Sequence, residues 1–213
     1  MASSYTDAKG VYRNKLGITD TQQLKRVEYE LTTNRSSEIL EQKVLGHVQG
    51  YGLARHQAIH RHLFQDVYEW AGKTRTVPSS KRMAGGMTSV FADPGTLEKS
   101  WQALEQKTSA FVNAKGLTFE QKRAALVDVF IEANHIHPFP EGNGRSLQVF
   151  VKELAHEQGV ELDYTQTNAE EWNRASALSG TYGTLFEHQY LIPRPSDPEP
   201  IKQIFSRIAS PLA

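Results

Sequence analysis

The most informative stretch of this chain is HPFPEGNGR, residues 137–145. Apolar residues recur at helical spacing on both sides of it, in residues 126–131 and again in residues 147–151. The stretch itself is rich in glycine and charged residues, which is typical of a loop held between two rigid elements. We therefore expect a helix–loop–helix at the centre of the fold, with the second helix starting at about Gly144.

The same stretch combines groups that suit a phosphate ester bound to a metal. His137 can accept a proton near neutral pH, and Glu141 is a hard oxygen ligand of the kind that Mg²⁺ takes beside substrate phosphates. Gly142 and Gly144 let the backbone turn its N–H groups toward one spot, to which the next helix adds its positive end. Arg145 supplies a planar fork for phosphate oxygens. A glycine-rich turn between helices is also common without any function, but the order of these groups favours an active site.

Length and composition limit the class of protein. A chain of 213 residues suits one domain and can bury a core without disulfides, which the absence of cysteine excludes. Lys+Arg and Asp+Glu number 24 each, so the charge does not favour a nucleic-acid partner. The chain has no apolar run near the roughly 18 residues of a membrane span, and residues 1–5 do not resemble a secretory signal. We expect a cytoplasmic protein without a membrane partner, although export by a specialised secretion system would leave no mark in this pattern.

Helical patterns cover most of the chain. Residues 73–93 lose the helical period and mix apolar residues with glycine and proline, which predicts a small β-hairpin. Four prolines in residues 193–200 predict an extended connector. We predict one mainly α domain over residues 1–192, followed by a connector and a short helix in residues 193–213 that pack on it. The expected helices cover about 20–45, 59–72, 94–111, 118–136, 144–158, 168–179 and 201–209.

The central stretch resembles the signature of the Fic family, His-Pro-Phe-x-Asp/Glu-Gly-Asn-Gly-Arg-x-x-Arg, through its first arginine. Residues 59–75, which read IHxxLFxxVYxWAGxxR, are similar to the family's helix and turn before a target-binding flap. The tract KLGI at residues 15–18 is similar to the family's N-terminal part. The resemblance extends over about residues 10–190. It implies the Fic fold, a helical bundle with a central helix–loop–helix motif and a small β-hairpin flap.

The resemblance also implies an activity: transfer of AMP from ATP, with Mg²⁺, to a Ser, Thr or Tyr hydroxyl of a target protein. It implies that His137 is the catalytic base and that Glu141 binds the metal. It implies a bacterial toxin of a toxin–antitoxin pair or a secreted effector. The implied nucleotide-binding residues are Gly142, Asn143, Gly144, Arg145 and Gln148, with the Asn143 side chain on the α-phosphate. The implied target-binding flap contains Val77, Pro78, Ser79, Ser80, Lys81 and Arg82.

One position departs from the family pattern. Gln148 stands where the family has its second arginine, which the resemblance assigns to the γ-phosphate and to an inhibitory glutamate. Glutamine carries no charge, and a neutral hydrogen bond is weaker than a charge-assisted one. The family's inhibitory motif, Ser/Thr-x-x-x-Glu-Gly/Asn, is absent, and Ser37-x-x-x-Glu41-Gln42 is a near miss. The resemblance therefore implies a separate small antitoxin that carries this motif, or no such inhibition.

Three alternatives remain open on the sequence. The first is another donor on the same scaffold, such as a different nucleoside triphosphate or a phosphocholine or phosphate donor. The second is a catalytically weak nucleotide-binding module, which only Gln148 supports. The third is a zinc hydrolase, with His135, His137, Glu141 and His156 as its ligands. The four-residue spacing of His56 and His60 also fits a helical metal pair, but packing histidines are the more common outcome.

Overall fold

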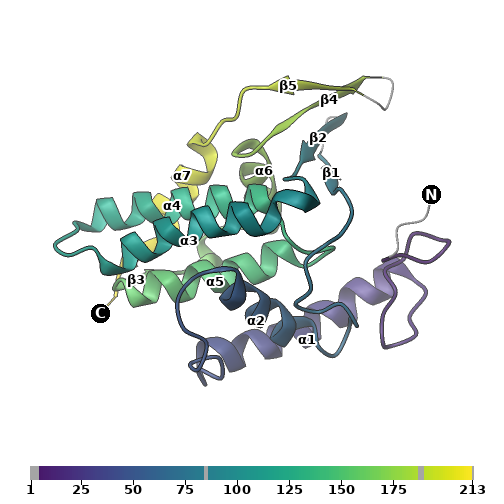
Figure 1. Ribbon diagram of the computed structural model, residues 1–213, viewed down its shortest axis with the longest axis horizontal. Coiled ribbons are helices and arrows are strands. Elements are labelled where there is room, and N and C mark those ends of the chain that lie inside the picture. Colours follow the sequence, from purple (N-terminus) through teal and green to yellow (C-terminus); the bar gives the residue numbers. More distant parts are fainter. Residues whose placement is uncertain (1–4, 84–85, 187–189, 213) are drawn as a thin grey trace.

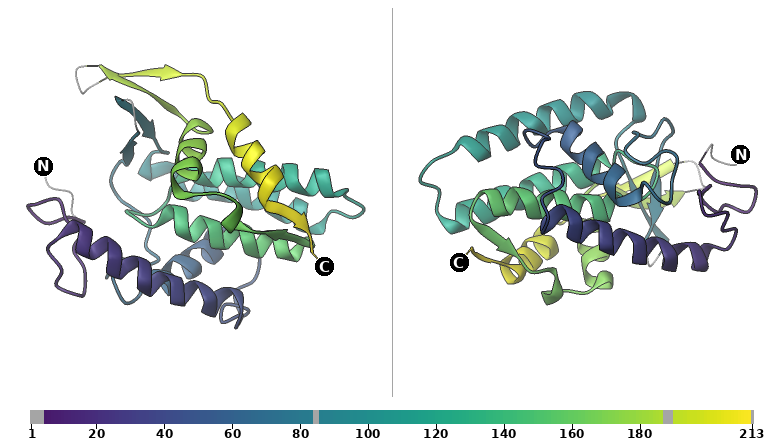
Figure 2. Two further views of the ribbon diagram at one scale, coloured as in Figure 1. Left: turned by 180° about the vertical axis from the view of Figure 1, so that it is seen from behind. Right: turned by 90° about the horizontal axis from the view of Figure 1, so that it is seen from below.

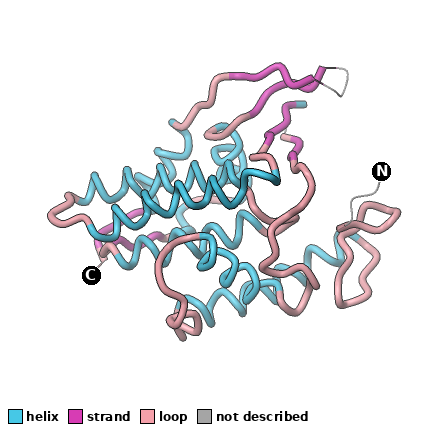
Figure 3. Tube along the Cα trace, in the orientation of Figure 1, coloured by secondary structure: helices cyan, strands magenta, loops and turns pink. Residues whose placement is uncertain are grey.

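Helices dominate the computed structural model, which describes residues 5–83, 86–186 and 190–212. The helices are α1 (Thr21–Leu40), α2 (Leu53–Phe64), α3 (Leu97–Asn113), α4 (Phe119–Ile136), α5 (Asn143–Glu157), α6 (Ala169–Leu178) and α7 (Glu199–Ile208). The strands are β1 (Ser80–Arg82), β2 (Met87–Val90), β3 (Val160–Leu162), β4 (Tyr182–Phe186), β5 (Tyr190–Arg194) and β6 (Ala209–Pro211). Figure 3 shows how little of the chain is strand. The predicted mainly α class is confirmed.

Helix α5 lies at the centre of the bundle, with the HPFPEGNGR loop at its N-terminal end. It packs against α1, α2 and α4. Figure 1 shows α3, α4 and α5 running alongside one another, with α1 and α2 below them, and Figure 2 shows the same packing from two other sides. Leu147, Phe150, Val151 and Leu154 of α5 are at most 2% exposed, as the helical spacing of apolar residues predicts.

Side-chain caps begin the helices where the sequence predicts them. The Asp20 carboxylate accepts a hydrogen bond from the Gln23 N–H at 2.7 Å and starts α1. Thr118 and Gln121 form a reciprocal capping box that starts α4. These caps confirm two predicted helix starts.

Helix α1 ends at Leu40, whereas the sequence predicted that it continues toward Leu45. Lys43 adopts a positive φ of 54°, which a right-handed helix cannot contain. Leu45 is nevertheless only 8% exposed. The apolar pattern therefore continued past the helix because the following turn also packs on the core.

The predicted hairpin in residues 73–93 is present as β1 and β2, but it belongs to a larger sheet. Four antiparallel strands lie in the order β1-β2-β4-β5. The second hairpin was missed in the sequence, and β5 runs across the predicted boundary between residues 192 and 193. A Cβ on Gly183 would lie 2.1 Å from the Ile192 carbonyl oxygen, so the two strands approach too closely there for any side chain. Pro193 is tolerated because β5 is an edge strand.

The C-terminal residues return to the bundle. Helix α7 packs against α4 and α6, and β6 pairs with β3 in a separate two-stranded sheet. The predicted C-terminal helix is present as α7, and it contacts the helices of the bundle. Among the described residues, none of the helices combines the length and apolar character needed to cross a membrane.

Candidate active site

The candidate base, His137, lies at the point where α4 ends. Its backbone is left-handed, with φ 49° and ψ 63°. This conformation is strained for a residue with a side chain and persists only where the surroundings enforce it. The His137 N–H donates to the Ala133 carbonyl at 3.1 Å, and the His137 carbonyl accepts from Arg75 Nε at 2.8 Å. The chain therefore turns sharply at the residue that the sequence predicts to be the base.

Arg75 connects this turn to the flap. Its side chain is buried, with 2% of the residue exposed. Besides the His137 carbonyl, its guanidinium binds the carbonyl of Val77, before β1, and that of Ala92, after β2. The Arg75 N–H donates to the Pro138 carbonyl at 2.7 Å. Sequence reasoning gave Arg75 no role, although it lies in the second stretch that resembles the family.

The His137 ring is held in one orientation and one protonation state. It stacks on Phe91, with ring centroids 3.6 Å apart and an angle of 8° between the planes. Its Nδ1 lies 3.3 Å from the Asn134 carbonyl, which can only accept, so Nδ1 carries the proton and Nε2 is left to accept one. Burial, with smaller effects from Lys81 and Arg75, lowers the pKa of His137 to about 3. The ring is therefore neutral at pH 7, as a general base requires.

The loop after His137 is closed by the side chain of Asn143. The Asn143 amide donates to the Phe139 carbonyl at 2.8 Å and accepts from the Phe139 N–H at 2.9 Å. Asn143 is only 5% exposed, and Phe139 is fully buried. The prediction that the Asn143 side chain holds a phosphate therefore does not match this geometry. Because both ends of the amide bind the loop backbone, the side chain fixes the shape of the loop.

The two glycines of the loop lie in different surroundings. Gly142 has a φ of 78°, and a Cβ there would lie 2.3 Å from the ring of Phe64. Gly144 has open space around it and is exposed. It lies in the first turn of α5, where the backbone N–H groups lack partners within the helix and attract anions. Gly144 and His137 line the same cavity of about 70 Å³ between the flap and α6. The candidate base and the start of α5 therefore face one space.

Two buried histidines of α2, His56 and His60, form hydrogen bonds with the loop and the first turn of α5. His60 Nδ1 accepts from the Gly72 N–H at 2.9 Å, so its Nε2 carries the proton and donates to the Glu141 carbonyl at 2.9 Å. His56 Nε2 lies 2.9 Å from the Ser146 hydroxyl. Burial lowers the pKa of both histidines, in His60 to about 3. These residues are packing histidines that fix the loop, not a metal pair.

The four ligands of the zinc hydrolase alternative do not come together among the described residues. Among them, no three His, Cys, Asp or Glu side chains gather closely enough to hold a metal ion. His156 lies in the last turn of α5, whereas Glu141 lies in the loop before the first residue of that helix, Asn143. The histidine spacing alone could not show this, because it says nothing about distances across the fold.

The side chains of Glu141 and Arg145 lie near each other where the loop meets α5. The Glu141 side chain is 44% exposed, and its Oε1 lies 3.9 Å from Arg145 Nη2. A single accessible carboxylate fits Mg²⁺, which takes one or two protein carboxylates and fills its other positions with substrate phosphates and water. The Arg145 guanidinium lies over the Phe64 ring, 4.9 Å from its centre, and also pairs with Glu28 of α1. Sequence reasoning missed Glu28.

Gln148 lies one turn beyond Arg145 on α5. Both residues line a cavity of about 270 Å³ between α1 and α5, together with Thr33 and Ser37 of α1. The Gln148 carbonyl accepts from the Tyr164 hydroxyl at 3.1 Å. The position that departs from the family signature is thus accessible from this cavity and adjoins the predicted phosphate site.

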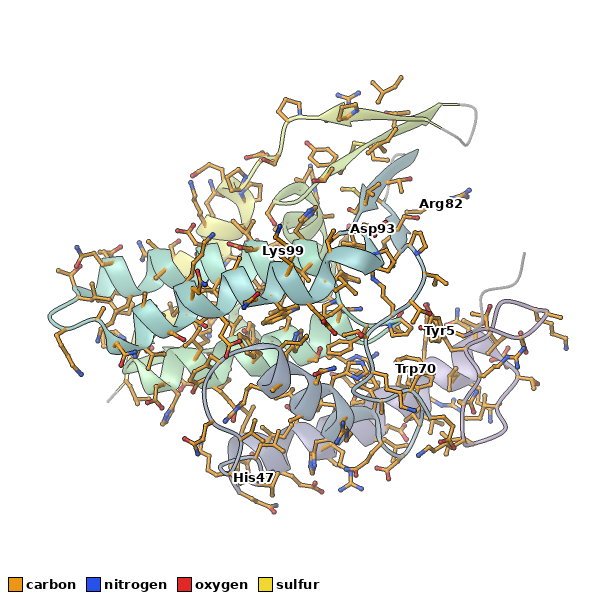
Figure 4. The ribbon with its side chains drawn as sticks, in the orientation of Figure 1. Tyr5, His47, Trp70, Arg82, Asp93 and Lys99 are labelled. Carbon is orange, nitrogen blue, oxygen red and sulfur yellow. The ribbon has the colours of Figure 1, made fainter. Side chains whose placement is uncertain are left out.

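The predicted flap residues form a connecting segment and a strand. Val77, Pro78 and Ser79 lead from Arg75 into β1, and Ser80, Lys81 and Arg82 form it. All three β1 residues are exposed, and Lys81 pairs with Ser89 of β2. Figure 4 shows the Arg82 side chain pointing away from the body of the molecule. Since β1 is the first strand of the sheet, its outer edge is open to another strand. The predicted hairpin also includes Gly85, which lies outside the described residues.

These features agree with the comparisons to known proteins. The chain belongs to the Fic/DOC family, whose family model matches residues 53–155. It is 34% identical over 175 residues to a probable protein adenylyltransferase Fic from Salmonella typhimurium, and the match covers 82% of each chain. It is 36% identical over 180 residues to the protein adenylyltransferase VbhT from Bartonella schoenbuchensis, a match that covers 84% of this chain. The chain spans 36% of the length of VbhT and 28% of a protein adenylyltransferase from Bartonella henselae.

Solved structures show the same fold. The N-terminal Fic domain of a putative cell filamentation protein from Bartonella quintana, with bound ADP, has a TM-score of 0.79 and 25% identity, covering 100% of this chain and 97% of that one. The BepC protein from Bartonella tribocorum, with bound AMPPNP, has a TM-score of 0.79 and 24% identity, covering 100% and 99%. The predicted Fic fold is therefore confirmed.

Proposed function

We propose that this chain is a protein adenylyltransferase that moves AMP from ATP to a Ser, Thr or Tyr hydroxyl of another protein. One observation carries the proposal: a neutral, oriented His137 and the N-terminal end of α5 at Gly144 line the same cavity. A base and an anion site that face one space are what nucleotidyl transfer to a hydroxyl requires. The names of the relatives and the bound ADP and AMPPNP of the structural neighbours support this choice of substrate.

The chemistry follows from these positions. His137 Nε2 takes the proton of the acceptor hydroxyl while the hydroxyl oxygen attacks the α-phosphorus. A new O–P bond forms, the bond between the α-phosphorus and the β-bridging oxygen breaks, and pyrophosphate leaves. The N–H groups at the start of α5 stabilise the charge on the α-phosphate oxygens, and Arg145 stabilises the charge on the leaving β-phosphate. Mg²⁺ bound by Glu141 would add positive charge beside the same phosphates.

The flap would hold the target in place. A segment of the target can add as a further strand to the open edge of β1, where main-chain hydrogen bonds require little sequence. The register pairs Lys81 with Ser89, and Met83 N–H donates to the Met87 carbonyl. Because alternate residues of an antiparallel strand bind opposite neighbours, the main-chain groups of Ser80 and Arg82 face the open edge.

The test is intact-mass spectrometry after incubation with ATP and Mg²⁺ and a cell lysate as a source of targets. His137→Ala should lower the rate of AMP addition, to targets or to the protein itself, by about 10²–10⁴-fold. His47→Ala is the matched control, because His47 is exposed and far from the loop in Figure 4. AMP addition that survives His137→Ala would overturn the assignment of the base. Nucleotide binding without transfer to any protein would favour the weak binding module.

The donor is a separate question because of Gln148. A second candidate function, transfer from another donor, rests on this one residue. The same assay with the other nucleoside triphosphates and with CDP-choline would decide it. Gln148→Arg restores the family charge, and we expect it to increase the affinity for ATP but not for AMP, since only ATP has a γ-phosphate for the new guanidinium.

The biological setting is also a proposal. We propose either a toxin controlled by a separate small antitoxin that carries Ser/Thr-x-x-x-Glu-Gly/Asn, or an effector delivered by a secretion system. The cavity between α1 and α5 offers a place beside Gln148 for an inhibitory helix. The BepC neighbour is described as a VirB-translocated effector protein, which supports delivery. Action in a cytoplasm fits both settings, because ATP and protein targets are available there.

A further inference from the structure

The predicted phosphate-binding arginine is held by a helix that lies outside the span matched by the family model. Glu28 and Thr32 are one turn apart on α1, so both side chains face the same neighbour. Arg145 Nη2 pairs with Glu28 Oε1, and Arg145 Nη1 donates to Thr32 Oγ1 at 3.3 Å. The matched span begins only at residue 53. The contact therefore joins a separate part of the chain to the candidate active site.

Glu28 is itself fixed in place. It is only 5% exposed, and its second oxygen, Oε2, accepts from the Tyr68 hydroxyl. Tyr68 is 1% exposed and stacks on Trp70, with ring centroids 4.1 Å apart. Burial and the nearby Glu28 carboxylate raise the pKa of Tyr68, so its hydroxyl stays protonated and continues to donate. A buried carboxylate with a partner on each oxygen is held in the orientation that faces Arg145.

These contacts leave part of the guanidinium available. An arginine has five N–H donors. One hydrogen of Nη2 goes to Glu28 and one of Nη1 goes to Thr32, which leaves three of the five without a hydrogen-bond partner among the described residues. Phe64 covers one face of the guanidinium, and the Arg145 side chain remains 29% exposed. Side chains of α1 thus bind two of the guanidinium donors and leave the other donors for an anion.

We propose that Glu28, with Thr32, is a positioning residue that holds Arg145 ready for the β-phosphate of the nucleotide. The inference rests on the proposed function for the identity of the ligand. Its physical basis is preorganisation: a long side chain that is already ordered loses less conformational entropy when it binds. A competing role for Glu28, in which it neutralises Arg145 and must release it, predicts the opposite change in affinity.

The experiment compares nucleotides with and without a β-phosphate. Isothermal titration calorimetry with AMPPNP and Mg²⁺, and separately with AMP, would be run on wild type, Glu28→Ala, Glu28→Gln and Thr32→Val. Glu30→Ala is the matched control, because Glu30 is an exposed glutamate on the same helix. We expect Glu28→Ala to raise the Kd for AMPPNP by roughly tenfold, Glu28→Gln and Thr32→Val to raise it less, and the Kd for AMP to change less than about twofold in each variant.

A second step separates positioning from general damage. In an Arg145→Ala background, Glu28→Ala should weaken AMPPNP binding no further, because there is no longer a guanidinium to position. In transfer assays, Glu28→Ala should raise KM for ATP more than it lowers kcat. Circular dichroism and urea midpoints would confirm that each variant is folded.

Each other outcome counts against the inference. Unchanged or tighter AMPPNP binding in Glu28→Ala would overturn it, and tighter binding would favour the competing role. Equal weakening for AMP and AMPPNP would assign Glu28 to the stability of the fold alone. If wild type binds no nucleotide, the proposed function fails as well. If wild type binds AMPPNP but Glu28→Ala binds it equally well, only this inference fails.

Discussion

The HPFPEGNGR loop and the flap lie beside each other but are built in opposite ways. In the loop, Phe139 and Asn143 are buried and hydrogen-bonded to each other. In the flap, β1 exposes all of its residues and leaves one edge unpaired. Chemistry requires groups held to a fraction of an ångström, whereas a target segment can be recognised by main-chain groups on an accessible edge. Rigidity and openness are thus divided between two neighbouring regions, with Arg75 bound to both.

Arg75→Met should give the largest loss of stability, because it removes this connection. The substitution leaves the partly buried carbonyls of Val77, Ala92 and His137 without their donors, at about 1–3 kcal/mol each. We expect the free energy of unfolding to fall by about 3 kcal/mol or more, as measured by urea denaturation. Arg26→Met is the control, since Arg26 is exposed, and it should change stability by less than about 0.5 kcal/mol. Equal effects of the two substitutions would contradict the role of Arg75 as a connection.

Gly142→Ala tests whether the loop tolerates any movement. The positive φ at position 142 costs about 1–2 kcal/mol of stability for a residue with a Cβ. The clash of that Cβ with Phe64 costs roughly 1–3 kcal/mol more. Gly116→Ala is the matched control, because Gly116 has a similar φ of 71° but open space around it. Urea denaturation of both variants therefore separates the clash from the backbone strain. Identical losses would mean that the loop moves aside easily and is not rigid.

The buried histidines beneath the loop should make stability depend on pH. Their folded pKa values lie below the unfolded value of about 6.5, so their stabilising effect is complete above that pH and is lost as the pH falls. From pH 6.5 to pH 5, His60 alone should cost about 2 kcal/mol, at roughly 1.4 kcal/mol per pH unit. His60→Gln should flatten this dependence in urea midpoints, whereas substitution of the exposed His47 should not. A slope unaffected by His60→Gln would assign the dependence to other groups.

Phe91→Ala tests the contact between flap and base. Wild-type transfer should stay constant from pH 8 to below pH 6, because His137 acts in its neutral form and its pKa is about 3. Loss of the stacked ring exposes His137 to water and moves its pKa toward 6.5. The rate–pH profile should then fall about tenfold between pH 7.5 and pH 5.5. Phe119→Ala, at the distant start of α4, should keep the wild-type profile. An unshifted profile in Phe91→Ala would mean that Phe91 does not control the pKa of His137.

Arg82→Pro should have the smallest effect on stability. Proline is tolerated at the outer edge of a sheet because its missing N–H would face solvent, so stability should change by less than about 0.5 kcal/mol. Target modification should nevertheless weaken, because one main-chain donor for an added strand is lost. AMPPNP affinity, measured by calorimetry, should not change. Undiminished target modification would mean that the target does not bind along this edge.

The sequence by itself determined the parts of this protein that depend on near neighbours. The caps at Asp20 and Thr118 and the helical spacing around the loop act over a few residues, so they could be read directly. The same holds for the candidate base, because His137 adjoins in sequence the glycines and the charged groups with which we propose that it works. The resemblance then extended these local patterns to the family and the flap.

The tertiary structure decided what depends on distant partners. Strand β4 of the second hairpin pairs with β2, almost a hundred residues away in sequence. No local sequence pattern predicts such a partner. Asn143 and Phe139 are close in sequence, but only the shape of the loop showed that they satisfy each other. Glu28 and Arg145 are 117 positions apart. Their contact exists because packing brings α1 against α5, and a hydrogen bond depends on where atoms lie in space and not on their order in the chain.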